Sequence, residues 1–312
     1  MGIVQTVDRA QKRGRTAAVS VATFKKFSED RTTNLAAMVA FWGFFSIFPL
    51  FLVLITVLAW VLPASDKNDV LGHVARMLPL LDPSTVSGLT GAWWAFAIGL
   101  VSALWSGTGV VRTLQFAFDS VAEVPYHQRP GLVKQTLRSL WVLATIGVGL
   151  VITTLLSGLV SSSASGVHLG VVGHIAGYVL AALLDVGIFV AAFRILSESS
   201  GGTREVLPGA LLSGIGFFVL QELSALIVSH YLQSAQSTYG HFATVITILW
   251  WFYLQANLTL FGAQLNIVLK ERLFPRSLVD APQTEADHRV LKAYAAERTY
   301  VPEQVVETRV ER

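Results

Sequence analysis

Two carboxylates stand inside long apolar stretches of this chain, and they are its first candidates for chemistry. Asp185 and Glu222 are the acidic residues that interrupt otherwise uncharged runs. An ionised carboxyl group in hydrocarbon costs about 2.5–3.5 kcal/mol on insertion scales, so such groups are functional candidates by default. Counted from the inner ends of membrane helices, Asp185 would lie ~16 Å deep and Glu222 ~24 Å deep. They are therefore interpreted as two separate positions along one polar path through the membrane and not as a dyad that shares one proton. The structural alternative is a neutral or hydrogen-bonded group, with Asp185 reaching Arg194 or Arg112.

The last apolar stretch, residues 243–269, carries amide side chains on opposite faces. Gln255 and Asn266 share one face at helical spacing. Asn257 and Gln264 lie roughly opposite them. Because amide groups should not face lipid tails, we expect this helix to lie inside a bundle or beside a water-filled cavity. These four amides and the two carboxylates are the candidate residues of a polar path.

The first apolar stretch, residues 35–62, contains a proline that predicts a kink. Pro49 cannot donate a hydrogen bond to the Phe45 carbonyl, and the hydroxyl of Ser46 is available to the freed backbone groups. The kink is either purely structural or a hinge for gating, in which case Ser46 and Pro49 form the hinge.

Other sequence patterns weigh against an enzyme. There is no cysteine, and no GxSxG, HExxH or P-loop motif occurs. Five histidines fall near the predicted outer face without HxxxH spacing, so they predict interfacial hydrogen bonding and not a metal site: His73, His168, His174, His230 and His241. We expect no catalytic residue, no metal and no cofactor.

Six apolar stretches predict an all-α, polytopic membrane protein. The 312 residues are 53% hydrophobic and only 14% charged, whereas a soluble domain carries about 25% charge. Each stretch approaches or exceeds the roughly 20 residues that an α-helix needs to span a bilayer. The predicted domain, residues 35–269, is a six-helix bundle with short amphipathic helices at the interfaces. Its predicted spans are 35–62, 92–111, 139–160, 171–196, 206–229 and 243–269.

The distribution of basic residues predicts the orientation. Of the 23 Lys and Arg residues, all but Lys67 and Arg76 lie in the two terminal segments or in alternate loops and helix ends. This positive-inside pattern places both termini in the cytoplasm. The basic balance is therefore a topology signal, and no nucleic-acid partner is expected. Membrane lipids are the expected partners, and the candidates for contact with anionic headgroups are Arg112, Arg138 and Arg194.

Three segments outside the spans have their own predictions. Residues 1–34 form a basic arm that is either solvated or an amphipathic helix on anionic headgroups. Residues 70–81, in the outer loop, have apolar spacing that predicts a short interfacial helix. Residues 270–312 form a polar, partly disordered tail. Thr284 and Asp287 predict the start of a short helix within that tail.

Several blocks of sequence resemble one family of membrane proteins. They are NLAAMVAF (34–41), FSIFPL (45–50), LWSGTG (104–109), LPGA (207–210), YGHFA (239–243), LWWFYL (249–254) and LFGAQLN (260–266). The chain resembles the YihY/virulence factor BrkB family over residues 25–275. The resemblance implies a six-helix protein of the bacterial inner membrane. Relatives often carry Glu where this chain has Gln264, which removes that carboxyl from any proton or cation role here.

The leading expectation for function is a transporter or flippase-like protein for an envelope lipid or similar amphiphile. Some relatives are linked to export of envelope lipids, so the resemblance also implies this. The alternative is a non-transporting scaffold that recruits envelope partners. A ribonuclease, which older family labels invoke, ranks third because the catalytic groups that such an enzyme needs are missing.

Overall fold

The chain folds into helices, and several are long enough to cross a membrane. The computed structural model describes residues 8, 11, 14–61, 93–145, 171–196, 202–223, 242–278 and 284–306, and all regular structure within these ranges is helical. Five helices in this described part have the length and composition of membrane spans: Thr32–Leu50, Trp93–Val121, Ala176–Leu196, Thr203–Glu222 and Phe242–Lys270. The predicted all-α, polytopic membrane protein is confirmed.

The long helices follow the predicted spans with shifted ends. They are α3 (Thr32–Val61), α6 (Trp93–Val121), α8 (Val171–Leu196), α9 (Thr203–Glu222) and α11 (Phe242–Lys270). Helix α8 has the predicted bounds, whereas α6 continues past the predicted end at residue 111 to Val121. Helix α9 begins earlier than predicted, at Thr203, and Pro208 lies in its second turn.

Part of the prediction falls outside the described residues. Residues 132–145 are helical and include the start of the predicted span 139–160. The rest of that span and the predicted interfacial helix 70–81 lie outside the described residues. So do the side chains of the five outer histidines.

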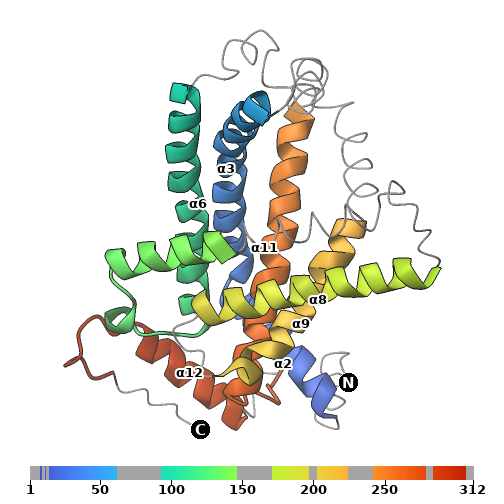
Figure 1. The fold of residues 1–312 in the computed structure, drawn as a ribbon. Helices are drawn as coiled ribbons and strands as arrows, with labels where there is room; N and C mark the ends of the chain where they lie inside the picture. Colours follow the sequence, from blue (N-terminus) through green and yellow to red (C-terminus); the bar gives the residue numbers. More distant parts are fainter. Residues whose placement is uncertain are drawn as a thin grey trace. The chain divides into compact units, whose positions relative to one another are not determined.

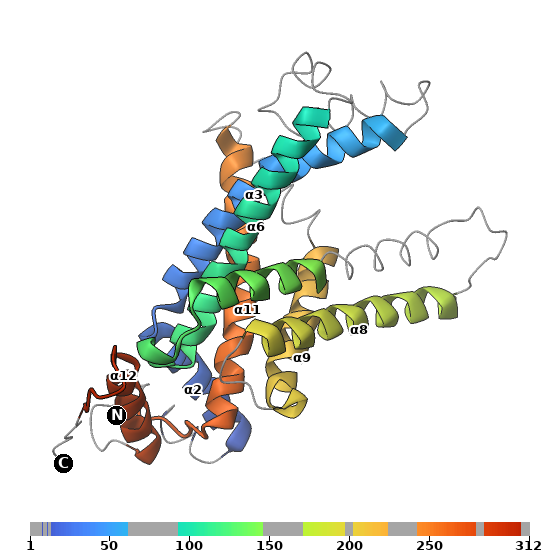
Figure 2. The ribbon, with the colours of Figure 1, turned by 60° about the vertical axis from the view of Figure 1, so that its left-hand side comes forward.

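The described chain divides into two compact units. The first consists of Met1–Ala36, Leu114–Glu222 and Gln255–Arg312, and the second of Ala37–Thr113 and Leu223–Leu254. Figures 1 and 2 show how the helices follow one another along the chain.

In the second unit, α3 and α6 lie side by side (Figures 1 and 2). Glycines of α6 make the contact close. A Cβ on Gly99 would lie 3.1 Å from Leu52, and one on Gly109 would lie 2.4 Å from the indole of Trp42. That indole also meets Trp105 edge-on at 5.8 Å. These glycines therefore form a helix-packing surface on α6.

In the first unit, α8 packs against α9. A Cβ on Gly214 would lie 2.7 Å from the Val186 backbone, so the two helices touch through their main chains. Phe189 adds an aromatic contact with Phe217 at 5.8 Å.

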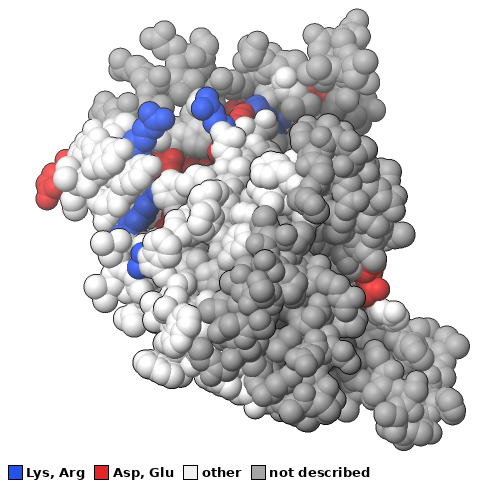
Figure 3. Space-filling model, turned by 90° about the horizontal axis from the view of Figure 1, so that it is seen from above, with Lys and Arg blue, Asp and Glu red and all other residues white. Residues whose placement is uncertain are grey.

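Apolar side chains cover much of the described surface. Trp105, Val133 and Trp141 are 67%, 76% and 70% exposed. In Figure 3, uncharged residues form most of the described part of the face that is shown, and few charged residues interrupt them. Such a surface suits lipid contact, because a soluble protein rarely exposes large continuous apolar patches.

Two helices of the first unit end in the same way, with a non-glycine residue in the left-handed region. Glu123 follows α6 with φ 48°, and Arg272 follows α11 with φ 52°. In both turns the next amide bonds back to a carbonyl of the last helical turn: Val124 N to Asp119 O at 2.9 Å and Leu273 N to Val268 O at 3.0 Å. These are Schellman motifs, in which glycine is the usual residue.

We expect Arg272→Gly to stabilise the protein by about 1 kcal/mol, because glycine removes the steric cost of the left-handed conformation. Thermal unfolding of purified protein in detergent measures this gain. Glu271→Gly is the matched control, and it should be destabilising because Glu271 is not in the left-handed region. A lower melting temperature for Arg272→Gly than for the wild type would contradict the assignment of strain.

Candidate functional site

One lysine of the N-terminal arm is fully buried and surrounded by oxygen atoms. Lys26 lies on α2 (Arg15–Glu29) with its side chain 0% exposed. Its Nζ donates to Asp30 Oδ2 at 2.6 Å, to Val121 O at 2.9 Å and to Glu123 Oε1. The three protons of the ammonium group are therefore all used. The ring of Tyr294 lies 5.7 Å from the same nitrogen.

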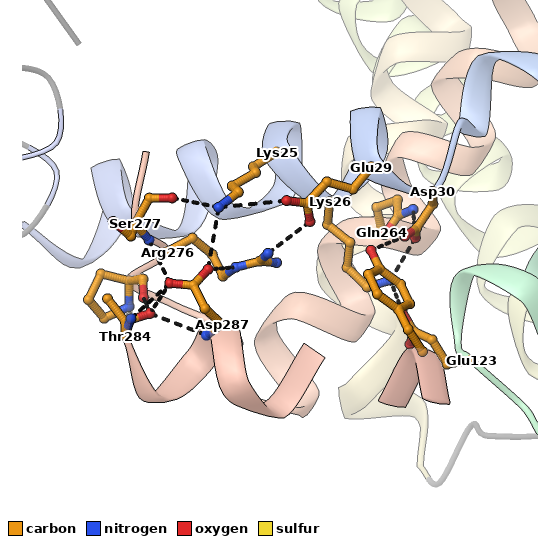
Figure 4. A network of polar contacts seen from close by, with 12 residues as sticks. Lys25, Lys26, Glu29, Asp30, Glu123, Gln264, Arg276, Ser277, Thr284 and Asp287 are labelled. Atoms are coloured by element: carbon orange, nitrogen blue, oxygen red, sulfur yellow. Dashed lines mark hydrogen bonds and ion pairs between the residues drawn. The ribbon is translucent and has the colours of Figure 1, made fainter. Parts of the chain in front are cut away.

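Asp30 joins the lysine to two more helices (Figure 4). Its Oδ2 accepts from Gln264 Nε2 at 2.6 Å, and its Oδ1 accepts from Tyr294 Oη at 2.5 Å. Gln264 Nε2 also donates to Thr32 Oγ1 at 3.0 Å. Gln264 is 0% exposed, and its Oε1 has no donor among the described residues. We call Lys26, Asp30, Glu123, Gln264 and Tyr294 the Lys26 cluster.

Local sequence explains how each member is positioned. Lys26 and Asp30 are four residues apart, so they share one face at the end of α2. The left-handed turn after α6 places Glu123 beside the last carbonyls of that helix. Gln264 comes from α11, and Tyr294 comes from α12 (Glu285–Glu297) in the tail. Four segments that are distant in sequence therefore meet at one buried ion pair.

A second group of charges ties the tail to the same arm helix. Arg276 donates through Nε to Asp287 Oδ1 at 2.5 Å and through Nη2 to Glu29 Oε2 at 2.8 Å. Lys25 Nζ lies 3.4 Å from Asp287 Oδ1. Asp287 also closes a capping box with Thr284, which confirms the predicted start of the short tail helix. Figure 4 shows these contacts beside the Lys26 cluster.

Electrostatics differ between the two groups. At Asp287, burial opposes ionisation, but hydrogen bonds from Thr284 and Arg276 outweigh it and hold the pKa well below its usual range. At Glu123, burial raises the pKa to about 7, against the opposing pull of Lys26. Asp287 is thus a permanent anion, whereas Glu123 changes charge near neutral pH.

The four predicted path amides have different surroundings. Gln264 belongs to the Lys26 cluster. Asn266 bridges α11 to α9, since its Oδ1 accepts from Gly209 N at 2.7 Å and its Nδ2 donates to Val206 O at 3.2 Å. Gln255 and Asn257 are half-buried. Gln264 and Asn266 therefore have protein partners within the first unit.

The predicted charged residues differ in their exposure to solvent. Asp185 is 7% exposed on α8 and makes no hydrogen bond or ion pair with the described residues. Glu222 is exposed at the end of α9. Arg194 is exposed, and its Nη1 donates to Thr203 Oγ1 at 3.2 Å. The other two arginines, at positions 112 and 138, are half-buried.

The predicted hinge lies within a continuous helix. Helix α3 passes through Pro49 and continues to Val61. The Ser46 hydroxyl donates to the Gly43 carbonyl at 2.7 Å, so it does not satisfy the Phe45 carbonyl that Pro49 leaves free. Figure 2 shows the axis of α3 changing direction along its length.

Sequence reasoning did not single out Lys26, Asp30 or Glu123. These residues lie among other charged residues of the arm and of the segment after α6. One signal was present, since a Lys and an Asp four residues apart form a standard helical ion pair. Nothing local indicated that this pair is buried, because the covering residues come from distant segments.

Known proteins similar to this chain are membrane proteins and a protein with a nuclease-like name. The profile of the virulence factor BrkB family matches residues 23–287. The chain is 26% identical over 270 residues to the ribonuclease-like protein YfkH of Bacillus subtilis, which covers 80% of this chain and 94% of that protein. It is 24% identical over 215 residues to a UPF0761 membrane protein of Pseudoalteromonas translucida, covering 66% of each chain. A UPF0761 membrane protein of Pseudomonas paraeruginosa is 25% identical over 277 residues, covering 82% of this chain and 64% of that one.

The chain thus spans about two thirds of the length of these two UPF0761 relatives. No solved structure matches it. The family profile covers most of the residues, and the described helices include five with the character of membrane spans. This multi-pass membrane protein belongs to the virulence factor BrkB family.

Proposed function

We propose that this protein moves an envelope lipid or a similar amphiphile in the bacterial inner membrane. The observation that carries the proposal is Asp185. Its carboxyl group is buried on an apolar span and has no hydrogen bond or ion pair within the described residues. A membrane protein retains such a costly group where water or a polar ligand reaches it.

The expected substrate has an anionic headgroup and apolar chains. Arg112, Arg138 and Arg194 lie toward the predicted cytoplasmic ends of their helices, where the positive-inside pattern places basic groups. Guanidinium groups suit phosphate and carboxylate headgroups because they donate in a planar fork. The exposed apolar side chains of the helices would contact the acyl chains of this substrate.

We propose no catalytic step. YfkH carries a ribonuclease-like name, but a metal-dependent nuclease needs clustered carboxylates or histidines. Within the described residues, no group of three or more His, Cys, Asp or Glu side chains is placed to hold a metal ion.

Lipid movement in reconstituted vesicles tests the role of Asp185. Purified protein is incorporated into vesicles that contain a fluorescent anionic phospholipid, and the rate of exchange between leaflets is measured. We expect Asp185→Asn to reduce this rate at least tenfold, because the amide keeps the shape of the side chain but cannot carry a negative charge. A tenfold reduction corresponds to an increase of about 1.4 kcal/mol in the activation free energy. Glu205→Gln, at an exposed ion pair with Lys270, is the control and should match the wild type. Equal rates for Asp185→Asn and the wild type would remove Asp185 from the path.

The scaffold alternative is supported by a separate observation. The end of the tail carries exposed apolar side chains, with Tyr300, Val301 and Val305 at 65%, 51% and 84%. Tyr300 stacks on Tyr126 at 4.9 Å, which fixes this segment to the inner loop after α6. A fixed, apolar surface of this kind suits a partner protein. Wild-type vesicles that exchange lipid no faster than protein-free vesicles would favour the scaffold over the transporter.

A further inference from the structure

The Lys26 cluster holds more negative charge than its single cation can neutralise. Lys26 contributes one positive charge, whereas Asp30 and Glu123 are both potential anions with side chains only 5% exposed. A buried charge without a partner is strongly unfavourable, so one carboxyl group must gain a proton or the cluster must open to water.

The neighbouring elements do not correct this imbalance. Helix α12 contributes Glu297, whose charge also repels that of Glu123, and Glu297 itself pairs with Arg129 at 2.7 Å. Helix α11 contributes the neutral Gln264. The largest charge effects on Glu123 come from one cation, Lys26, and from two anions, Asp30 and Glu297.

Hydrogen bonding shows the same imbalance. Gln264 Oε1 is a fully buried acceptor without a donor among the described residues, while both protons of its amide nitrogen are directed at Asp30 and Thr32. The cluster thus has more acceptors than protons. A proton on a carboxyl group removes one negative charge and converts one acceptor into a donor.

We infer that the Lys26 cluster is a binding site for one proton, carried by Glu123, and that this proton stabilises docking of the arm and tail onto the ends of α6 and α11. The proton comes from water and returns to it, so no other reactant is needed. Docking is affected because Lys26, Glu123, Gln264 and Tyr294 belong to four different segments. Ionisation of Glu123 leaves an excess charge among them, which water can relieve only if they separate.

The direction of the pH dependence follows from the pKa of Glu123. Burial raises it from 4.5 to about 7 in the docked state. A group whose pKa is higher in the docked state stabilises docking. This contribution has its full size at pH values below the pKa of the undocked state. That contribution is lost as the pH rises through the docked value. The equilibrium constant for docking should therefore fall by up to about tenfold per pH unit between the undocked pKa of 4.5 and the docked pKa of about 7. Above the docked pKa it should become constant.

Distances between two spin labels test the inference on the full-length protein. The chain has no cysteine, so Ser20→Cys on α2 and Gln128→Cys after α6 accept labels at these positions alone. Both residues are exposed. We expect one short distance at pH 5 and a growing population of longer distances as the pH rises through 7. With Glu123→Gln added, the short distance should persist at every pH, because the amide cannot ionise. Glu205→Gln, at an exposed pair, should behave as the wild type.

An unchanged distance distribution in the wild type from pH 5 to 8.5, or an unaltered pH response in Glu123→Gln, would overturn the inference. If Glu123→Gln does not fold, infrared spectroscopy of the wild type supplies the second measurement. A protonated buried carboxyl band that disappears between pH 6 and 8 supports the site, and its absence at pH 6 contradicts it. Neither measurement requires transport, so the inference and the proposed function can fail independently.

Discussion

Lys26→Met is expected to destabilise the protein by about 3–5 kcal/mol, which is the usual cost of removing one partner from a buried ion pair. The methionine fills a similar volume but leaves Asp30 and Glu123 facing each other without a cation. It also leaves the Val121 carbonyl without its donor. Chemical or thermal unfolding of purified protein in detergent at pH 7 gives the change, because Glu123 is then partly ionised and the cluster is still docked in a large part of the molecules.

The adjacent lysine provides the matched control. Lys25 has a side chain 25% exposed and takes part in ion pairs at 3.4 and 3.6 Å. Lys25→Met should therefore cost less, about 1 kcal/mol, since the lysine is partly exposed and ion pairs at these distances are weak. In the double variant Lys26→Met/Glu123→Gln, part of the lost stability should return because the repulsion is gone. A Lys26→Met protein as stable as Lys25→Met would show that the buried pair does not matter for folding.

Gly209→Ala is expected to cost about 3 kcal/mol by forcing α9 and α11 apart. The new Cβ would lie 2.1 Å from the Gly262 carbonyl oxygen and 2.5 Å from Asn266 Nδ2. A carbonyl in the middle of a helix cannot turn away, so the helices themselves must separate. This separation also breaks the hydrogen bond from Gly209 N to Asn266. Unfolding in detergent measures the loss.

Gly187→Ala on α8 is the control for the same chemical change. A Cβ at Gly187 meets nothing within 4 Å, so the variant should be neutral or more stable by up to about 1 kcal/mol from helix propensity. If both variants unfold alike, close contact between α9 and α11 is not what holds these helices together.

The spans were predictable from sequence because hydropathy depends on a helix's own residues. The stretch 171–196 is apolar throughout, and α8 has these bounds. The start of α9 was less predictable, since its first turn contains polar Thr203, Arg204 and Glu205 and resembles a loop in hydropathy. Helix ends in polar sequence depend on backbone hydrogen bonds and not on lipid.

The candidate site was less predictable because its contacts join distant positions. Gln264 and Asp30 are separated by 234 positions. Helical spacing correctly indicated that the amides of α11 need polar surroundings, yet it could not say whether water or protein supplies them. For Gln264 and Asn266 the partners are protein groups on α2, α3 and α9. Periodicity predicts which residues share one face of a helix, but only the folded structure shows which groups those residues contact.

Glu123 is expected to carry a titrating proton inside the Lys26 cluster. Nuclear magnetic resonance of protein labelled with carbon-13 at glutamate carboxyl groups measures it directly, with Glu123→Gln identifying the signal. We expect a titration midpoint at a pKa of about 7 for this carboxyl group, against 4.5 for an unperturbed one. A midpoint near 4.5 in the folded protein would contradict it.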